Sequence, residues 1–144
     1  MNAQFDHYLI IDDSKISRQV LASALTKLGV NQQSVLQAAS VDDAEAQWNV
    51  LDKTHGIVFL DIILPGHGGG WGLLSRFKKE WPDVPIIVLS SRSDSQSVFQ
   101  ARDLGASYYL IKPFTIEKLQ LALQKLAARK GEFPGNLSRI GGDE

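Results

Sequence analysis

The chain has 144 residues, of which 44% are apolar and 22% charged, and its formal net charge at pH 7 is −1. This length predicts a single domain with its own core, and the near-neutral charge leaves no electrostatic footprint for nucleic acid or an anionic membrane. The absence of cysteine excludes disulfides, thiolate catalysis and cysteine-ligated zinc. Residues 1–7 do not have the pattern of a signal peptide, and no apolar run is long enough to span a membrane, so we expect a cytoplasmic protein.

Five short apolar runs alternate with segments in which apolar residues recur at helical spacing. The predicted strands cover residues 8–11, 35–39, 56–61, 84–89 and 108–111. The predicted helices cover residues 14–28, a segment from Ser40, a segment around Trp71 that stops before Pro82, residues 93–104, and Thr115 to about Lys130. Ser40 and Thr115 are predicted to cap their helices, and Ser93 and Gln96 have the spacing of a capping box. Apolar runs of this kind are typical of strands buried on both faces of a sheet. The alternation predicts an α/β fold, a doubly wound five-stranded parallel sheet with five helices.

The first and last helices carry apolar stripes. The stripe of the first helix contains Ile16, Val20, Ala24 and Leu28, with Leu21 and Leu25 beside them. The stripe of the last helix contains Ile116, Leu119, Leu123, Leu126 and Ala127, which leaves Leu121 on the opposite side. Leu121 is either an ordinary exposed leucine or part of a docking or dimer surface. Residues 131–144 are rich in glycine and polar residues, and we expect them to form a tail or linker stub after a domain at 1–130.

Polar side chains follow four of the predicted strands where each strand ends. They are Asp12 and Asp13, Asp61, Ser90, and Lys112. Because the carboxyl ends of parallel strands meet at one edge, where open α/β sheets bind ligands, these groups should lie close together. Three adjacent carboxylates repel each other unless positive charge lies among them. Mg²⁺ and one lysine would supply that charge, and the hydroxyl and ammonium are suitable donors to a phosphoryl group.

The ordered set of these residues resembles a two-component response-regulator receiver domain of the chemotaxis-regulator type. The resemblance covers about residues 7–130 and includes the run Lys112-Pro113-Phe114-Thr115 and an aromatic residue, Tyr109, three positions before Lys112. It implies a flavodoxin-like fold with strand order 2-1-3-4-5. It also implies a signalling switch, not an enzyme that turns over an external metabolite.

The resemblance implies a role for each matching residue. Asp61 would take a phosphoryl group from a phosphohistidine of a sensor histidine kinase or phosphotransfer protein. Asp13 and Asp61 would hold Mg²⁺ with the backbone carbonyl of Ile63, and Asp12 would act largely through bound water. Lys112 would pair with a phosphoryl oxygen. Ser90 would move to hydrogen-bond another, Tyr109 would swing inward behind it, and the surface of helix 4, strand 5 and helix 5 would change for an output partner, with a possible homodimer on phosphorylation.

Two features depart from the family pattern. Ile63 and Arg92 stand at the positions that usually tune hydrolysis of the aspartyl phosphate, two residues after the acceptor and two after the switch hydroxyl. Since Ile63 cannot orient a water and Arg92 would shield the phosphoryl group, we predict slow self-dephosphorylation. The glycine-rich segment at 66–72 is either a phosphate-binding loop, for which no Gly-Lys-Ser/Thr follows, or a flexible loop beside the site.

Other interpretations stay open at this point. The chain would alternatively be a phosphohydrolase with Asp12 as nucleophile, a flavodoxin-like cofactor binder, or the regulatory part of a DNA-binding regulator whose output domain lies beyond Glu144. Asp12 would alternatively be a helix-start carboxylate and Tyr109 an ordinary half-buried aromatic. The three histidines lack metal-ligand spacing, and the three tryptophans, including Trp71, are interpreted as packing residues.

Overall fold

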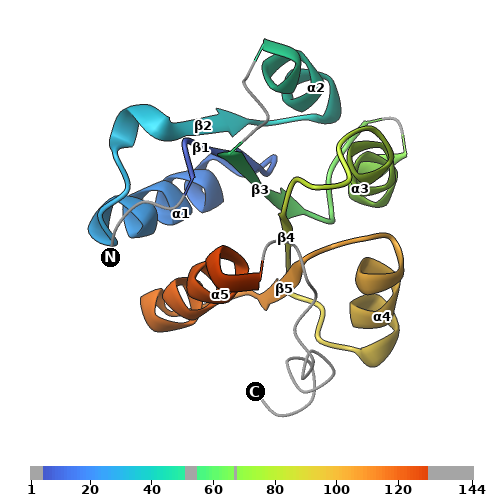
Figure 1. Cartoon of the computed structure of the whole chain (residues 1–144). Coiled ribbons are helices and arrows are strands. Elements are labelled where there is room, and N and C mark those ends of the chain that lie inside the picture. Colours follow the sequence, from blue (N-terminus) through green and yellow to red (C-terminus); the bar gives the residue numbers. More distant parts are fainter. Residues whose placement is uncertain (1–4, 51–54, 67, 130–144) are drawn as a thin grey trace.

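The computed structural model describes residues 5–50, 55–66 and 68–129, in which five strands alternate with five α-helices (Figure 1). The strands are β1 (His7–Ile11), β2 (Val35–Ala38), β3 (Gly56–Asp61), β4 (Ile86–Ser90) and β5 (Tyr108–Ile111). The α-helices are α1 (Lys15–Lys27), α2 (Val41–Val50), α3 (Gly69–Glu80), α4 (Ser95–Asp103) and α5 (Ile116–Arg129), and a 3₁₀ turn, η1 (Gln32–Ser34), precedes β2. The predicted alternation of strands and helices is confirmed.

All neighbouring strands pair in parallel, in the order β2-β1-β3-β4-β5, which confirms the predicted fold. Strands β1, β3, β4 and β5 end at the same height in the sheet. Ile11 pairs with Leu60, Asp61 with Leu89, and Ser90 with Ile111. The register therefore brings the carboxyl ends of four strands to one edge.

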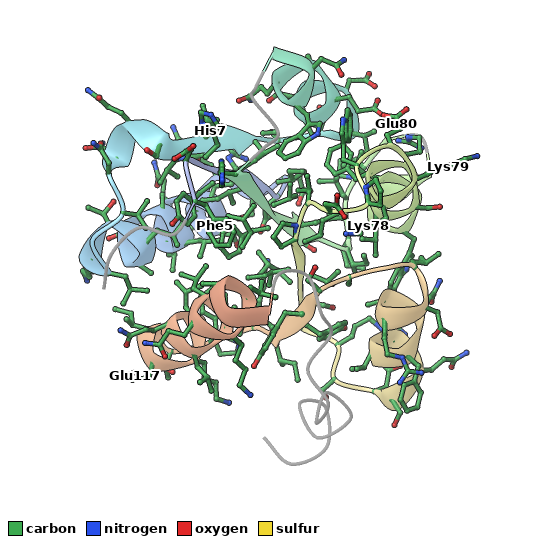
Figure 2. All side chains as sticks on the ribbon, in the orientation of Figure 1. Phe5, His7, Lys78, Lys79, Glu80 and Glu117 are labelled. Carbon is green, nitrogen blue, oxygen red and sulfur yellow. The ribbon has the colours of Figure 1, made fainter. Side chains whose placement is uncertain are left out.

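The sheet separates two apolar cores, because successive strand residues point to opposite faces. Helices α1 and α5 cover one face and α2, α3 and α4 the other (Figure 1). Side chains fill both spaces between the layers, while the charged Lys79, Glu80 and Glu117 lie at the periphery (Figure 2). All residues of β3 and β4 are buried, so the strand ends that carry the polar groups are firmly positioned.

The buried face of α1 differs from the predicted stripe. Leu21, Ala24, Leu25 and Leu28 are buried against the sheet, but Ile16 is 73% exposed and Val20 60% exposed. At about 100° per residue, Val20 lies about a quarter of a turn, and Ile16 about a third of a turn, from the centre of the face that packs on the sheet. Ile16 and Val20 therefore keep the helical period of the stripe but take no part in the buried face of α1.

The glycine-rich segment is largely helical, which corrects the prediction of a flexible loop there. Helix α3 begins at Gly69, and Gly70 is buried. A Cβ at Gly70 would lie 2.5 Å from the carbonyl oxygen of Ile62, so the first turn of the helix packs directly on the backbone that follows β3. This close contact requires glycine and outweighs its poor helix propensity.

The helix starts agree with prediction at three caps and differ at one. The side chains of Ser14, Ser40 and Thr115 accept hydrogen bonds from backbone N–H groups three residues ahead. Helix α4 is capped by Asp94 instead of Ser93: its carboxylate accepts from the Ser97 N–H at 2.9 Å and from the Ser97 hydroxyl at 3.1 Å. A carboxylate at the N-cap takes both bonds, so the predicted capping box of Ser93 and Gln96 does not form.

The remaining predictions about packing are confirmed within the described residues. Leu121 is 46% exposed on α5, opposite the buried Leu119 and Leu123. Trp48 is buried and Trp81 partly buried in a cluster with Phe77, with ring centroids 5.5 to 5.7 Å apart.

His67 and residues 131–144 lie outside the described residues. Among the described helices, none combines the length and the apolar character that a membrane span requires.

Candidate functional site

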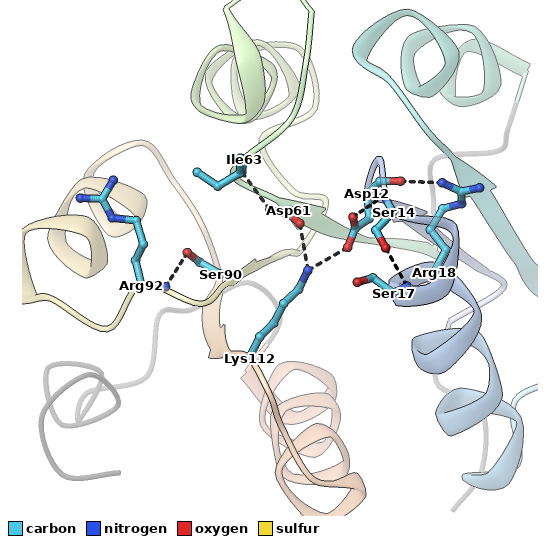
Figure 3. Close-up of polar contacts among 9 residues, drawn as sticks. All are labelled: Asp12, Ser14, Ser17, Arg18, Asp61, Ile63, Ser90, Arg92 and Lys112. Carbon is cyan, nitrogen blue, oxygen red and sulfur yellow. Dashed lines mark hydrogen bonds and ion pairs between the residues drawn. The ribbon is translucent and has the colours of Figure 1, made fainter.

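Four strand ends deliver polar side chains to one edge of the sheet (Figure 3). Asp12 follows β1, Asp61 ends β3, Ser90 ends β4 and Lys112 follows β5. Three of them are nearly inaccessible, since the exposed fraction is 1% for Asp12, 8% for Asp61 and 1% for Ser90. Buried polar groups need partners, so each of these residues has a defined role in a hydrogen-bond network.

Lys112 connects the two buried carboxylates. Its Nζ lies 2.8 Å from Asp12 Oδ2 and 2.9 Å from Asp61 Oδ2. Burial alone would lower the pKa of Lys112, but its bonds to both carboxylates raise the pKa above the ordinary value, so the side chain stays an ammonium. Burial raises the pKa of Asp61 above 3.8, and the bonds from Lys112 and the Ile63 N–H act in the opposite direction.

Asp12 is fixed at four points. Its backbone N–H donates to the Ala38 carbonyl at 3.0 Å, and its Oδ1 accepts from the Ser14 N–H at 2.9 Å. Its Oδ2 accepts from Lys112, and its backbone carbonyl accepts from Arg18 Nη1 at 2.8 Å. Asp12 is therefore a built part of the site and more than a carboxylate at a helix start.

Asp12, Asp13 and Asp61 form the carboxylate cluster that the sequence predicted. One oxygen from each lies within 4.8 Å of the others, and Asp13 is the exposed member of the three. Asp61 Oδ1 also accepts from the Ile63 N–H at 2.8 Å, and the Ile63 side chain is 61% exposed. A set of hard carboxylate oxygens with one side open to solvent suits a divalent cation such as Mg²⁺.

Ser90, Arg92 and Tyr109 form a second network beside Asp61. The Arg92 N–H donates to Ser90 Oγ at 3.0 Å, and the Tyr109 hydroxyl donates to the Arg92 carbonyl at 2.7 Å. Tyr109 is fully buried, so the inward swing that the resemblance implies would not start from an exposed ring. Burial raises the pKa of Tyr109, and a hydrogen bond with the Ser90 hydroxyl offsets this only in part.

The chain matches the sequence model of the response regulator receiver domain over residues 8–124. The chain belongs to this family. Among its relatives, the probable chemotaxis protein CheY of Rhizobium etli is 34% identical over 118 residues, which cover 81% of this chain and 88% of the relative. The probable transcriptional regulator ycf27 of Porphyridium aerugineum is 31% identical over 134 residues, which cover 92% of this chain and 52% of the relative. The chain thus spans about half the length of this regulator.

The solved structures give the same assignment. The crystal structure of the receiver domain of NtrX from Brucella abortus superposes with a TM-score of 0.73 at 28% identity, covering 84% of this chain and 98% of that one. Receiver domains are the phosphorylation-controlled signalling switches of two-component systems, and this chain is one of them.

In this receiver domain two site residues were not predicted from the sequence. Arg18 and Gln37 lie beside Asp12, with Arg18 Nε donating to Gln37 Oε1 at 3.1 Å. The Arg92 side chain, predicted to shield the phosphoryl group, is exposed and lies 3.5 Å from Asp94. The hydrogen bonds that Arg92 makes beside Ser90 and Tyr109 come from its backbone.

Proposed function

We propose that Asp61 is the phosphoacceptor of this receiver domain. A carboxylate oxygen of Asp61 attacks the phosphorus of a phosphohistidine, an O–P bond forms, the N–P bond breaks, and the imidazole leaves with that electron pair. The observation that carries this proposal is the convergence of Asp61 with Lys112 and two further carboxylates at one strand edge. Lys112 is placed to follow a phosphoryl oxygen, since it already binds Asp61 Oδ2.

The carboxylate cluster supports a Mg²⁺ requirement for this reaction. Asp13 and Asp61 would hold the ion with the carbonyl of Ile63, and Asp12 would act through bound water. When bound, Mg²⁺ neutralises charge on the phosphoryl group as it is transferred. The protein contributes position: Asp12 is fixed by four bonds and Asp61 by Lys112 and the Ile63 N–H, so little reorganisation is needed when the phosphoryl group arrives.

We propose that Ser90 and Tyr109 transmit the phosphorylated state. If the Ser90 hydroxyl turns to a phosphoryl oxygen, it leaves its hydrogen bonds with Tyr109 and the Arg92 N–H. Tyr109 and Arg92 then lose a shared anchor, and the segment between β4 and α4 is free to rearrange. This change would be read on the surface of α4, β5 and α5, where Phe99 is 39% exposed and Leu121 46% exposed.

The partners of the switch follow from this assignment. The donor would be a sensor histidine kinase or a phosphotransfer protein, and the output either a separate protein or a domain of the same polypeptide, as the length of the ycf27 regulator suggests. Residues 1–130 would form the receiver unit and 131–144 a tail or linker, in a cytoplasmic protein that signals and does not turn over a metabolite. Phosphorylation would favour a homodimer if the α4–β5–α5 surface meets its own copy.

The test is intact mass after incubation with Mg²⁺ and acetyl phosphate, for the wild type, Asp61→Asn and the exposed control Asp83→Asn. We expect one added phosphoryl group in the wild type and the control and none in Asp61→Asn. Phosphorylation that persists in Asp61→Asn would place the nucleophile elsewhere and favour an Asp12-dependent phosphohydrolase. An unmodified wild type, with donor and Mg²⁺ confirmed active, would contradict the proposal for small donors and would direct the test to a phosphohistidine protein.

A further inference from the structure

Arg18 contacts the backbone of the site from the side away from Lys112 (Figure 3). It lies in the first turns of α1, and its guanidinium reaches back to the loop after β1, where Nη1 donates to the Asp12 carbonyl at 2.8 Å. Its Nε donates to Gln37 Oε1 at 3.1 Å on the neighbouring strand β2. Two donors of one planar group are therefore engaged at once, which fixes the orientation of the guanidinium.

The support for this contact continues into the next layer of the fold. The Gln37 backbone carbonyl accepts from Gln47 Nε2 on α2 at 2.5 Å, and Gln47 Nε2 also lies 3.2 Å from Asp43 Oδ1. Asp43 in turn accepts from the Ala39 N–H at 3.2 Å. A chain of hydrogen bonds thus connects α2 and β2 to Arg18 and ends on the Asp12 carbonyl.

The Asp12 carbonyl is significant because it belongs to the peptide group that joins Asp12 to Asp13. A peptide group is planar, so a hydrogen bond that fixes its oxygen also fixes the nitrogen and Cα position of Asp13. Asp13 is exposed, and packing does not hold its side chain. Yet its carboxylate oxygen lies within 4.8 Å of those of Asp12 and Asp61, where like charges repel. The backbone must therefore hold Asp13 in place.

We propose that Arg18 is a positioning residue for the metal-binding carboxylates, acting through the Asp12–Asp13 peptide and oriented by Gln37. This inference rests on the proposed Mg²⁺-dependent phosphorylation of Asp61. The positioning role and a simple charge effect predict opposite results. A cation near the site repels Mg²⁺, so removing the charge of Arg18 would by itself tighten Mg²⁺ binding, whereas losing the peptide anchor weakens it.

The experiment is a titration with MgCl₂ alone, followed by amide ¹H–¹⁵N chemical shifts. The proteins are the wild type, Arg18→Ala, Arg18→Lys, Gln37→Ala and Arg102→Ala, a matched exposed arginine on α4. We expect Mg²⁺ to bind about tenfold more weakly to Arg18→Ala, as is typical when a partner of a metal ligand is removed. Arg18→Lys keeps the charge but lacks a planar guanidinium that can bond to Gln37 and the Asp12 carbonyl at once, so it should also bind Mg²⁺ more weakly. Gln37→Ala should lie between, and Arg102→Ala should match the wild type.

The metal-free spectra give a second readout. The Asp13 amide resonance should shift in Arg18→Ala, Arg18→Lys and Gln37→Ala and stay in place in Arg102→Ala. Unchanged or tighter Mg²⁺ binding in Arg18→Ala, with the Asp13 amide unmoved, would overturn the inference. If Arg18→Ala does not fold, Arg18→Lys and Gln37→Ala decide the same question. If the wild type binds no Mg²⁺, the proposed function fails, while the metal-free Asp13 amide still shows whether Arg18 positions it.

Discussion

Asp61 lies between two polar networks of different character (Figure 3). On one side, charged groups bind each other directly: Lys112 pairs with Asp12 and Asp61, and Arg18 binds the Asp12 carbonyl. On the other side, Ser90 and Tyr109 meet through neutral hydrogen bonds to the Arg92 backbone. Separating the buried charges of the first network would cost a large free energy. The neutral hydrogen bonds of the second network can be replaced by other hydrogen bonds at a small cost.

The difference in energy indicates which side moves. Removing one partner of a buried ion pair typically costs about 3–5 kcal/mol, whereas an ordinary hydrogen bond contributes about 1 kcal/mol net. A phosphoryl group at Asp61 would therefore leave the charged side largely in place and rearrange the neutral side. If the proposed function holds, the charged groups on one side of Asp61 bind the phosphoryl group and the neutral hydrogen bonds on the other side transmit the signal.

The largest effect is expected from Lys112→Met, which removes the cation of the charged side. Phosphorylation by acetyl phosphate should slow by about a hundredfold or more, the usual result of deleting one donor to a developing anion. The free energy of unfolding should fall by about 3 kcal/mol, because Lys112 has only 24% exposure and leaves two buried carboxylates unpaired. Mass spectrometry and urea unfolding measure the two effects. Lys79→Met, at an exposed lysine, is the matched control, and a wild-type rate in Lys112→Met would break the comparison.

The stability loss in Lys112→Met should also depend on pH in a defined direction. Burial already raises the pKa of Asp61, and the variant lacks the opposing effect of Lys112. A carboxyl whose pKa is raised by folding contributes most to stability when protonated, and that contribution is lost as pH rises through the folded pKa. The deficit relative to the wild type should therefore be larger at pH 7 than near pH 4. Urea unfolding at both pH values tests this, and a deficit that grows on acidification would contradict it.

A smaller effect is expected from Ile63→Asn, on the open side of Asp61. Ile63 is 61% exposed and cannot orient a water molecule by hydrogen bonding, whereas asparagine can. The phosphorylated variant should lose its phosphoryl group several times faster than the wild type, as followed by intact mass after donor removal. Ile63→Leu keeps an apolar side chain and should decay like the wild type. Decay of Ile63→Asn that is unchanged or slower would refute the predicted slow self-dephosphorylation.

A still smaller effect is expected from Tyr109→Phe on the neutral side. The variant keeps the ring but loses the bond to the Arg92 carbonyl, so the free energy of unfolding should fall by about 1 kcal/mol. Phosphorylation by acetyl phosphate should continue at close to the wild-type rate, because the Tyr109 hydroxyl bonds to the Arg92 carbonyl, whereas Lys112 bonds directly to Asp61. A loss of phosphorylation as large as that of Lys112→Met would mean that the two networks do not have separate roles.

The smallest effect on chemistry is expected from Leu121→Ser, beyond the neutral network. Leu121 is 46% exposed, so both the phosphorylation rate and the unfolding free energy should stay within measurement error of the wild type. Dimerisation or partner binding of the phosphorylated protein, measured by analytical ultracentrifugation or pull-down, should be lost. If Leu121→Ser keeps both dimerisation and partner binding, Leu121 is an ordinary exposed leucine and not part of a docking surface.

The strands and their polar ends were predictable because the physical signal is local. A run such as Ile57–Leu60 is apolar throughout, and the polar residue after it marks where burial ends. Once the strands were taken as parallel, the meeting of Asp12, Asp61 and Lys112 followed from geometry. The strand order itself came from the resemblance, since periodicity does not say which strands are neighbours.

Arg18 was not predicted because its contacts depend on tertiary structure. It reaches Gln37, 19 residues away, by a side-chain route that no spacing rule encodes. The exposure of Ile16 and Val20 was missed for a related reason. Two adjacent apolar stripes run along α1, and only the position of the sheet selects the one through Leu21 and Leu25.

The contact between Gly70 and the Ile62 backbone has a consequence for how displacement travels through the molecule. A side chain at position 70 would collide with the main chain of Ile62, so α3 and the segment after β3 meet with no side-chain atoms between them. Any shift of the Ile62 backbone, which follows Asp61 directly, would therefore meet the start of α3 with no side chain between them. Further along α3, Arg76 pairs with Glu45 of α2 at 3.0 Å, so the helix that contacts Ile62 is also connected to a second helix. Gly70, in a segment whose composition suggests a flexible loop, is thus the residue that lets α3 contact the main chain directly.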